Sequence, residues 1–228
     1  MVGKTEKTAV CTYCSNETEA TRDHVVPRAL FVGAYPSDPV IVPSCRPCNV
    51  GKSRDEPYFR DYLTLDLGGS QSPTAIELFQ TKVRRSHLKD KSELIRSVID
   101  TAEVKPLYSS GGVYLGHYPQ APINAQRIVS VLQLMVRGLY YDCCKELLPQ
   151  SCHIEVFRHN PWDQQGVIDR FFAQGIPATR KIGDVFACGF YRAKDNPTAT
   201  FWLLIFYGRV LFSATTVSRI PGIPGTQF

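Results

Sequence analysis

At 228 residues, the chain is long enough for one large domain or two small ones, and either can bury a hydrophobic core. Its 43% hydrophobic and 21% charged residues are typical of a globular protein and exclude a largely disordered chain. The formal net charge of +5 allows a polyanionic partner without requiring one.

The longest apolar run, 201–207, is too short to cross a membrane, and residues 1–7 do not form a secretory signal. We therefore expect a cytoplasmic protein with no membrane association. Of the 8 cysteines, four form two Cys-x-x-Cys pairs, whereas the other four lack such spacing. This pattern favours reduced, metal-binding thiols over a disulfide framework.

The polar residues 1–9 show no hydrophobic period, which predicts a flexible lead. Val25 and Val26 begin a short predicted strand that Pro27 limits, because proline has no amide hydrogen to donate to a β-ladder. A second strand at 40–42 is expected to pair with it in antiparallel fashion. Ser44 is a candidate N-cap for the helix that follows, which carries a proline in its first turn.

The Ser53–Glu56 sequence has the form of a capping box, and apolar residues follow it at helical spacing. We therefore predict a separate helix over 54–66. The Gly- and Ser-rich stretch 68–73 is the best candidate linker. It divides the chain into a domain at 1–67 and a second region at 68–228.

The second region is predicted to be α+β, with a long core helix and antiparallel strands. One or two helices are expected over 74–100, and Asn124 can cap a helix that runs to about Cys144. The Ser-Ser-Gly-Gly sequence at 109–112 is typical of a hairpin turn. Further strands are predicted at 153–157, 185–191, 200–207 and 210–217, the last two joined at Gly208.

The two Cys-x-x-Cys pairs predict a zinc site. Each pair can bring two sulfurs to one ion, and zinc favours tetrahedral coordination by thiolates. Such an ion stabilises a small subdomain by closing the loop between the pairs. The predicted structural ligands are Cys11, Cys14, Cys45 and Cys48.

A four-thiolate site has no open position, so any chemistry needs other residues. Asp23 and His24 are adjacent on a strand, where successive side chains point to opposite sides. Asp23 can therefore ligate a hard cation such as Mg²⁺, while His24 on the other side takes a proton from water. Asn49, directly after the last cysteine of the pairs, offers an amide oxygen to the same ion.

Taken together, Cys-x-x-Cys, Asp-His-x-x-Pro and Cys-x-x-Cys-Asn-x-x-Lys resemble the HNH endonucleases, and especially their zinc-bound branch, which includes phage Holliday-junction resolvases. The resemblance implies a ββα-metal fold, a catalytic base at His24, and a catalytic Mg²⁺ or Mn²⁺ at Asp23 and Asn49. Asn49 stands where many members have a final histidine. The family's middle asparagine has no clear equivalent, and Asp38 is the nearest candidate.

The resemblance also extends past the motif. The Asp55–Arg60 segment, together with 137–141 and 206–208, is similar to a bacterial subgroup of the same family. These stretches do not identify a substrate.

Four basic residues near the motif are candidates for contacts with nucleic-acid phosphates: Arg28, Arg46, Lys52 and Arg54. The basic tract over 82–91 is a weaker candidate, because such runs are usually solvated helix faces.

The sequence therefore predicts a metal-dependent HNH endonuclease that cuts DNA. Two alternatives stay open: a non-catalytic zinc module that binds nucleic acid or protein, and an RNA-directed nuclease or toxin-like effector. Cutting both strands of a duplex with one type of site would call for two copies of the chain, so a homodimer is allowed.

Overall fold

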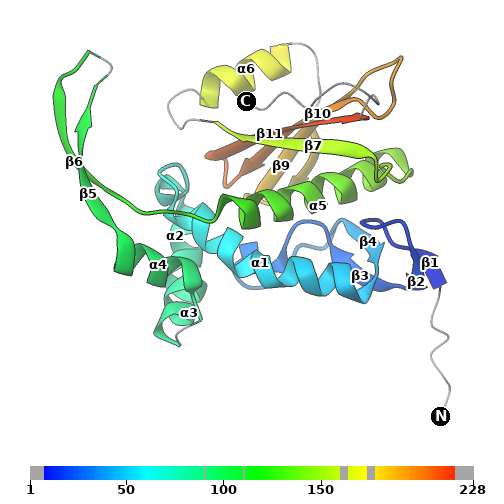
Figure 1. Cartoon of the computed structure of the whole chain (residues 1–228), viewed down its shortest axis with the longest axis horizontal. Helices are drawn as coiled ribbons and strands as arrows, with labels where there is room; N and C mark the ends of the chain where they lie inside the picture. Colours follow the sequence, from blue (N-terminus) through cyan, green and yellow to red (C-terminus); the bar gives the residue numbers. More distant parts are fainter. Residues whose placement is uncertain (1–7, 90, 110, 160–163, 174–177, 219–228) are drawn as a thin grey trace.

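The computed structural model describes residues 8–89, 91–109, 111–159, 164–173 and 178–218, and it mixes helices with antiparallel strands as predicted for an α+β chain (Figure 1). The strands are β1 (Thr8–Val10), β2 (Glu17–Glu19), β3 (Thr21–His24), β4 (Ile41–Ser44), β5 (Glu103–Tyr108), β6 (Tyr114–Gln120), β7 (Cys152–Arg158), β8 (Ala178–Ile182), β9 (Phe186–Arg192), β10 (Thr200–Phe206) and β11 (Val210–Ser218). The α-helices are α1 (Arg46–Leu65), α2 (Pro73–Leu78), α3 (Arg84–Leu88), α4 (Glu93–Thr101), α5 (Ala125–Cys144) and α6 (Gln164–Ala173). Two short 3₁₀-helices, η1 (Arg28–Leu30) and η2 (Gly69–Gln71), and a π-helix, η3 (Phe79–Val83), complete the described elements.

A five-stranded antiparallel sheet in the order β7-β11-β10-β9-β8 forms one layer. Because side chains alternate along β10, Trp202 and Leu204 face the main core while Leu203 joins a second cluster with Phe171 of α6. Helix α5 covers the opposite face of the sheet from α6 and lies between the sheet and α1 (Figure 1). Both faces of the sheet are therefore covered.

The N-terminal part contains two small hairpins and α1. The predicted antiparallel pair is confirmed in β3 and β4, which pair from Thr21 with Ser44 to His24 with Ile41. The first strand, however, ends at His24 and does not begin at Val25, because its ladder partners lie at 41–44. Residues 8 and 9, predicted as part of a flexible lead, belong to β1, which pairs with β2. Residues 1–7 of that lead lie outside the described residues.

One continuous helix, α1, replaces the two helices predicted over this stretch. Its N-cap is Cys45 and not Ser44, because the Cys45 sulfur accepts a hydrogen bond from the Cys48 amide. The capping-box prediction fails because Glu56 lies 3.5 Å from Lys52 one turn earlier, within the helix, and caps no new start. Pro57 is accommodated inside the helix.

The predicted linker at 68–73 is closely packed in the structure. A Cβ at Gly69 would lie 1.8 Å from the Leu63 carbonyl oxygen, and one at Gly68 would lie 2.4 Å from that of Arg209. One buried core includes residues from both sides of this stretch, such as Phe59 and Phe206. The division into 1–67 and 68–228 stays a prediction.

The other predicted elements are close to those in the structure. Helix α5 is capped by the Asn124 side chain, and its Ile128, Val131, Met135 and Leu139 are at most 4% exposed. Strands β7, β9, β10 and β11 match their predicted positions within two residues, as do the hairpins β5–β6 and β10–β11. Strand β8 and helix α6 were not predicted.

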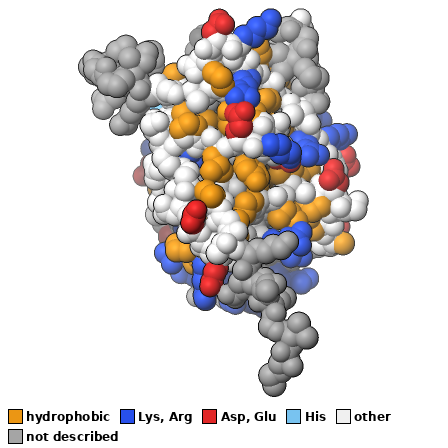
Figure 2. All heavy atoms as spheres, turned by 90° about the vertical axis from the view of Figure 1, so that its right-hand side faces the viewer, with side chains coloured by type: hydrophobic (Ala, Val, Ile, Leu, Met, Phe, Trp, Pro, Cys, Tyr) orange, Lys and Arg blue, Asp and Glu red, His pale blue; other side chains and the backbone are white. Residues whose placement is uncertain are grey.

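The surface carries two features of note. The β5–β6 hairpin extends away from the body of the protein (Figure 1). On the face shown in Figure 2, hydrophobic side chains gather across the middle, with charged side chains of both signs around them. None of the helices in the described parts of the chain combines the length and apolar character that a membrane span requires.

The contact between α5 and the motif predicts a sensitive position. A Cβ at Gly138 would lie 2.5 Å from the Val25 side chain, directly after His24. We expect Gly138→Ala to lower the free energy of unfolding by about 1–3 kcal/mol, because a fully buried Val25 cannot move aside freely. Gly51 lies on α1, and a Cβ added there would meet no atom within 4 Å, so Gly51→Ala should instead stabilise the protein by about 0.5–1 kcal/mol. Urea unfolding of both variants measures this, and equal effects would contradict the packing described.

Candidate functional site

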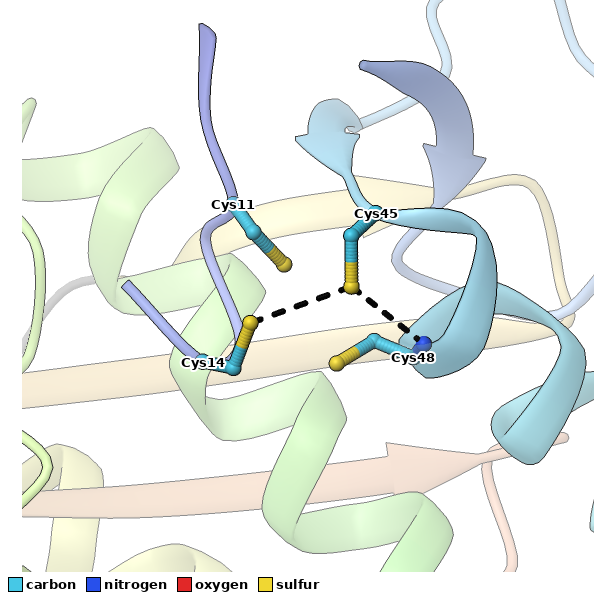
Figure 3. A group of neighbouring side chains, drawn as sticks. All are labelled: Cys11, Cys14, Cys45 and Cys48. Atoms are coloured by element: carbon cyan, nitrogen blue, oxygen red, sulfur yellow. Dashed lines mark hydrogen bonds between the residues drawn. The ribbon is translucent and has the colours of Figure 1, made fainter. Parts of the chain in front are cut away.

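The four paired cysteines meet at one point. Cys11 and Cys14 lie on the turn between β1 and β2, while Cys45 and Cys48 lie at the start of α1. Their sulfur atoms point toward one another (Figure 3) and all lie within 4.8 Å of one another. Among the residues that the structure describes, this is the group of three or more Cys, His, Asp or Glu side chains that can hold a metal ion.

The spacing of the sulfurs fits zinc. Two sulfurs bound tetrahedrally at about 2.3 Å from one zinc ion lie about 3.8 Å apart. The Cys14 and Cys45 sulfurs are separated by 3.8 Å, far longer than a disulfide bond, and all four thiols are free. The four thiols can therefore hold one zinc ion as closed, structural ligands.

The environment favours a thiolate at one of the four cysteines and opposes it at others. Burial alone would raise the pKa of Cys11, but hydrogen bonds from the backbone of Cys45, Cys14 and Tyr13 outweigh it and lower that pKa to about 7. Burial and the neighbouring thiols raise the pKa of Cys48. A thiolate at Cys11 is the form that a metal ion binds.

A buried cluster joins this site to Asp23. Asp23 lies on β3, is 5% exposed, and accepts hydrogen bonds on Oδ2 from the Lys52 ammonium at 2.7 Å and from the Tyr13 hydroxyl. Lys52, on α1, is 2% exposed and also donates to the His24 carbonyl oxygen. Both bonds to the carboxylate end on Oδ2, so Asp23 Oδ1 has no hydrogen-bond partner among the described residues.

Asn49 is oriented by a neighbouring hydroxyl. The Thr21 hydroxyl donates to the Ser44 carbonyl oxygen at 2.8 Å, so its oxygen must accept the hydrogen bond from Asn49 Nδ2 at 2.9 Å. This fixes which end of the Asn49 amide faces Thr21. The amide oxygen is left without a hydrogen-bond partner in the described part of the chain.

His24 lies at the end of β3 and is half-buried. Its ring packs edge-on against Tyr35, with 4.7 Å between the ring centroids. Burial lowers the pKa of His24, and the Arg28 cation lowers it further. The imidazole is therefore neutral at neutral pH and can accept a proton, and neither ring nitrogen has a hydrogen-bond partner among the described residues.

The other predicted site residues differ in their exposure and in their contacts. Arg28, Arg46 and Arg54 are exposed, as a phosphate contact requires. Lys52 was also predicted to contact phosphate, but its buried amine is held by Asp23 and the His24 carbonyl. Asp38, the candidate for the middle asparagine, pairs instead with Arg180 at 3.3 Å.

Sequence reasoning missed the parts that Tyr13 and Tyr35 play. Tyr13 lies between the first two cysteines and reaches Asp23, and Tyr35 packs on His24 and donates to the Val26 carbonyl oxygen at 2.7 Å. A tyrosine inside Cys-x-x-Cys is a signal that could have suggested a role. No pattern pointed to Tyr35.

Comparisons with protein-family models, with curated proteins and with solved structures give no match to this chain.

The thiol site predicts a metal content. We expect about one zinc ion per chain, lost in Cys48→Ser together with a lower unfolding temperature, because a structural zinc ion contributes directly to folding. Elemental analysis and thermal unfolding measure both. Cys144→Ser, outside the cluster, should keep its zinc, and a fully loaded Cys48→Ser protein would contradict the four-thiol site.

The buried ion pair predicts a large effect of removing its cation. Lys52→Met leaves the Asp23 carboxylate buried and without its ion partner, which should cost about 3–5 kcal/mol of unfolding free energy. The double variant Lys52→Met with Asp23→Asn should recover part of that loss, because no charge is then stranded. Urea unfolding tests this against Lys89→Met, an exposed lysine that should have little effect; equal losses in both lysine variants would argue against the pair.

Proposed function

We propose that the protein is an HNH-type endonuclease that hydrolyses phosphodiester bonds in DNA with a divalent cation. The observation that carries this proposal is that three side chains each keep polar atoms free of hydrogen bonds to the described residues. Asp23 Oδ1, the Asn49 amide oxygen and the His24 ring nitrogens have no hydrogen-bond partner within the described part of the chain, although the rest of each residue is held in place. They lie on β3 and on the first turn of α1, the two elements that the Asn49–Thr21 and Lys52–Asp23 contacts join.

These groups suit a hard cation and a base. Carboxylate and amide oxygens are ligands that Mg²⁺ and Mn²⁺ accept, so Asp23 and Asn49 would hold the ion. When bound, such an ion neutralises charge on the phosphate and on the leaving oxygen. The thiol site cannot do this, because its four ligands would close the zinc coordination shell.

The chain's own residues have separate tasks in this proposal. His24, neutral because burial and Arg28 lower its pKa, takes the proton of the attacking water. Lys52 and Tyr13 position Asp23 through Oδ2 and leave Oδ1 for the cation. The exposed guanidinium groups of Arg28, Arg46 and Arg54 are available to phosphate oxygens.

The test is cleavage of supercoiled plasmid DNA. The wild-type protein should nick it with Mg²⁺ or Mn²⁺ and not with EDTA, and His24→Ala should lower the rate by about 10²–10⁴-fold, the usual effect of a general base. Zinc content and unfolding temperature of the variant show whether it is folded. His153→Ala, a histidine on β7 outside the site, serves as the matched control.

Two outcomes would overturn the proposal. Undiminished nicking by folded His24→Ala would remove the proposed base. DNA binding without cleavage, with any divalent metal and unaffected by Asp23→Ala, would favour a non-catalytic zinc module, and RNA cleavage in a parallel assay would favour an RNA-directed nuclease.

A further inference from the structure

A compact loop places a cation beside His24. The Tyr35 ring lies 4.7 Å from the His24 ring and 4.6 Å from the Phe31 ring, measured between centroids. The Arg28 guanidinium lies 6.0 Å from the centroid of the same tyrosine. His24 and Arg28 are thus held on one aromatic residue, with Arg28 exposed to solvent.

The π-helix η3 is attached to this loop although it follows far later in the sequence. The Lys82 ammonium, on η3, donates to the Phe31 carbonyl oxygen. Directly after η3, Ser86 of α3 accepts a hydrogen bond from Arg60 of α1 at 3.3 Å. These two contacts, with Val83 fully buried, fix the segment 79–88 next to the His24 loop. A π-helix inside a helical segment is frequently found at functional sites.

Several arginines of the C-terminal half pair with carboxylates, whereas four exposed arginines of β3, the His24 loop and α3 do not pair with any in the described part of the chain. In the C-terminal half, carboxylates pair with arginines of α5, β7, β8 and β9: Arg127, Arg158, Arg180 and Arg192. The four exposed arginines without a carboxylate partner among the described residues are Arg22 on β3, Arg28 in the His24 loop, and Arg84 and Arg85 on α3.

Some cations of this region lie close enough to act on one another. Burial lowers the pKa of Lys82, and the Arg60 and Arg28 cations lower it further. Exposed arginines without carboxylate partners, next to a half-buried histidine, are typical of a surface that binds a polyanion.

The available contacts favour a duplex over a single strand. Proteins that bind single-stranded nucleic acid stack bases on exposed aromatic rings. Near His24, Phe31 is 4% exposed and Tyr35 is packed between its neighbours. The exposed tyrosines Tyr108, Tyr114 and Tyr118 lie on the β5–β6 hairpin instead. Exposed cations that have no exposed aromatic ring beside them are suited to contact the sugar-phosphate backbone and not to stack on bases.

We propose that η3 and α3 form a backbone-binding element for duplex DNA, in which Arg84 and Arg85 contact phosphates that flank the one beside His24. Arg28 connects this element to the site. The inference rests on the proposed function for its substrate class, but it concerns binding, so it is tested without cleavage.

The experiment is equilibrium binding of the full-length, zinc-loaded protein to a fluorescent DNA duplex, with EDTA-free buffer and Ca²⁺ in place of Mg²⁺, over a range of salt concentrations. The double variant Arg84→Ala with Arg85→Ala should bind more weakly, and the slope of log K against log salt should fall by about 1–2, because each lost phosphate contact removes about 0.9 from it. Unrelated duplex sequences should be affected equally.

The matched control is Lys105→Ala with Lys194→Ala, which removes the same two charges from the β5–β6 hairpin and from the loop after β9. An affinity and a salt slope that change equally in the two double variants would overturn the proposal, because net charge alone would then explain the effect. A loss confined to single-stranded DNA or RNA would also overturn it.

Failure of the DNA-binding element and failure of the proposed nuclease activity give different results. If the wild-type protein binds the duplex through Arg84 and Arg85 but cuts no DNA, the binding element stands and the nuclease proposal fails. If the wild-type protein nicks plasmid while the Arg84/Arg85 variant binds as tightly as the wild type, the binding element fails alone.

Discussion

The buried ion pair between Lys52 and Asp23 joins the pieces from which the candidate site is built. Asp23 belongs to β3, Lys52 to α1, and the Tyr13 hydroxyl that donates to the same carboxylate oxygen comes from the turn that carries Cys11 and Cys14. Removing two charges from water is costly, and the cost is offset only when the geometry and the additional hydrogen bonds are good. Here the lysine also donates to the His24 carbonyl oxygen, so one buried amine sets the positions of two consecutive strand residues.

This arrangement joins the thiol cluster to side chains of different chemistry. The thiol cluster is soft and closed, and its role is to tie the β1–β2 turn to the start of α1. The oxygens of Asp23 and Asn49 suit a hard cation, and they are oriented by neighbours that occupy the other atom of each group. Tyr13 lies within the first cysteine pair, and its hydroxyl donates to the Asp23 carboxylate. The position of the thiol cluster therefore helps to fix the position of that carboxylate.

The C-terminal part supports the N-terminal part at several points. Helix α5 packs Gly138 against Val25, and the Gln150 side chain donates to the Tyr13 carbonyl oxygen at 2.9 Å. The Tyr207 hydroxyl, after β10, donates to the Leu30 carbonyl oxygen at 2.9 Å. The segments on both sides of His24 therefore depend on packing that a fragment ending near residue 67 would lack.

Local patterns in the sequence were sufficient for the features that depend on near neighbours. Cysteines three positions apart bring their sulfurs together, the apolar period of Ile128 to Leu139 defines a buried helix face, and apolar runs broken at Gly208 define a hairpin. The tertiary structure alone decided the burial of Lys52, the reach of Tyr13 to Asp23, the continuity of α1, and the place of η3 beside the His24 loop. Most of these features join side chains far apart in the chain, and the continuity of α1 depends on how the helix packs. Such contacts form only when the whole chain folds, so no local periodicity or spacing encodes them.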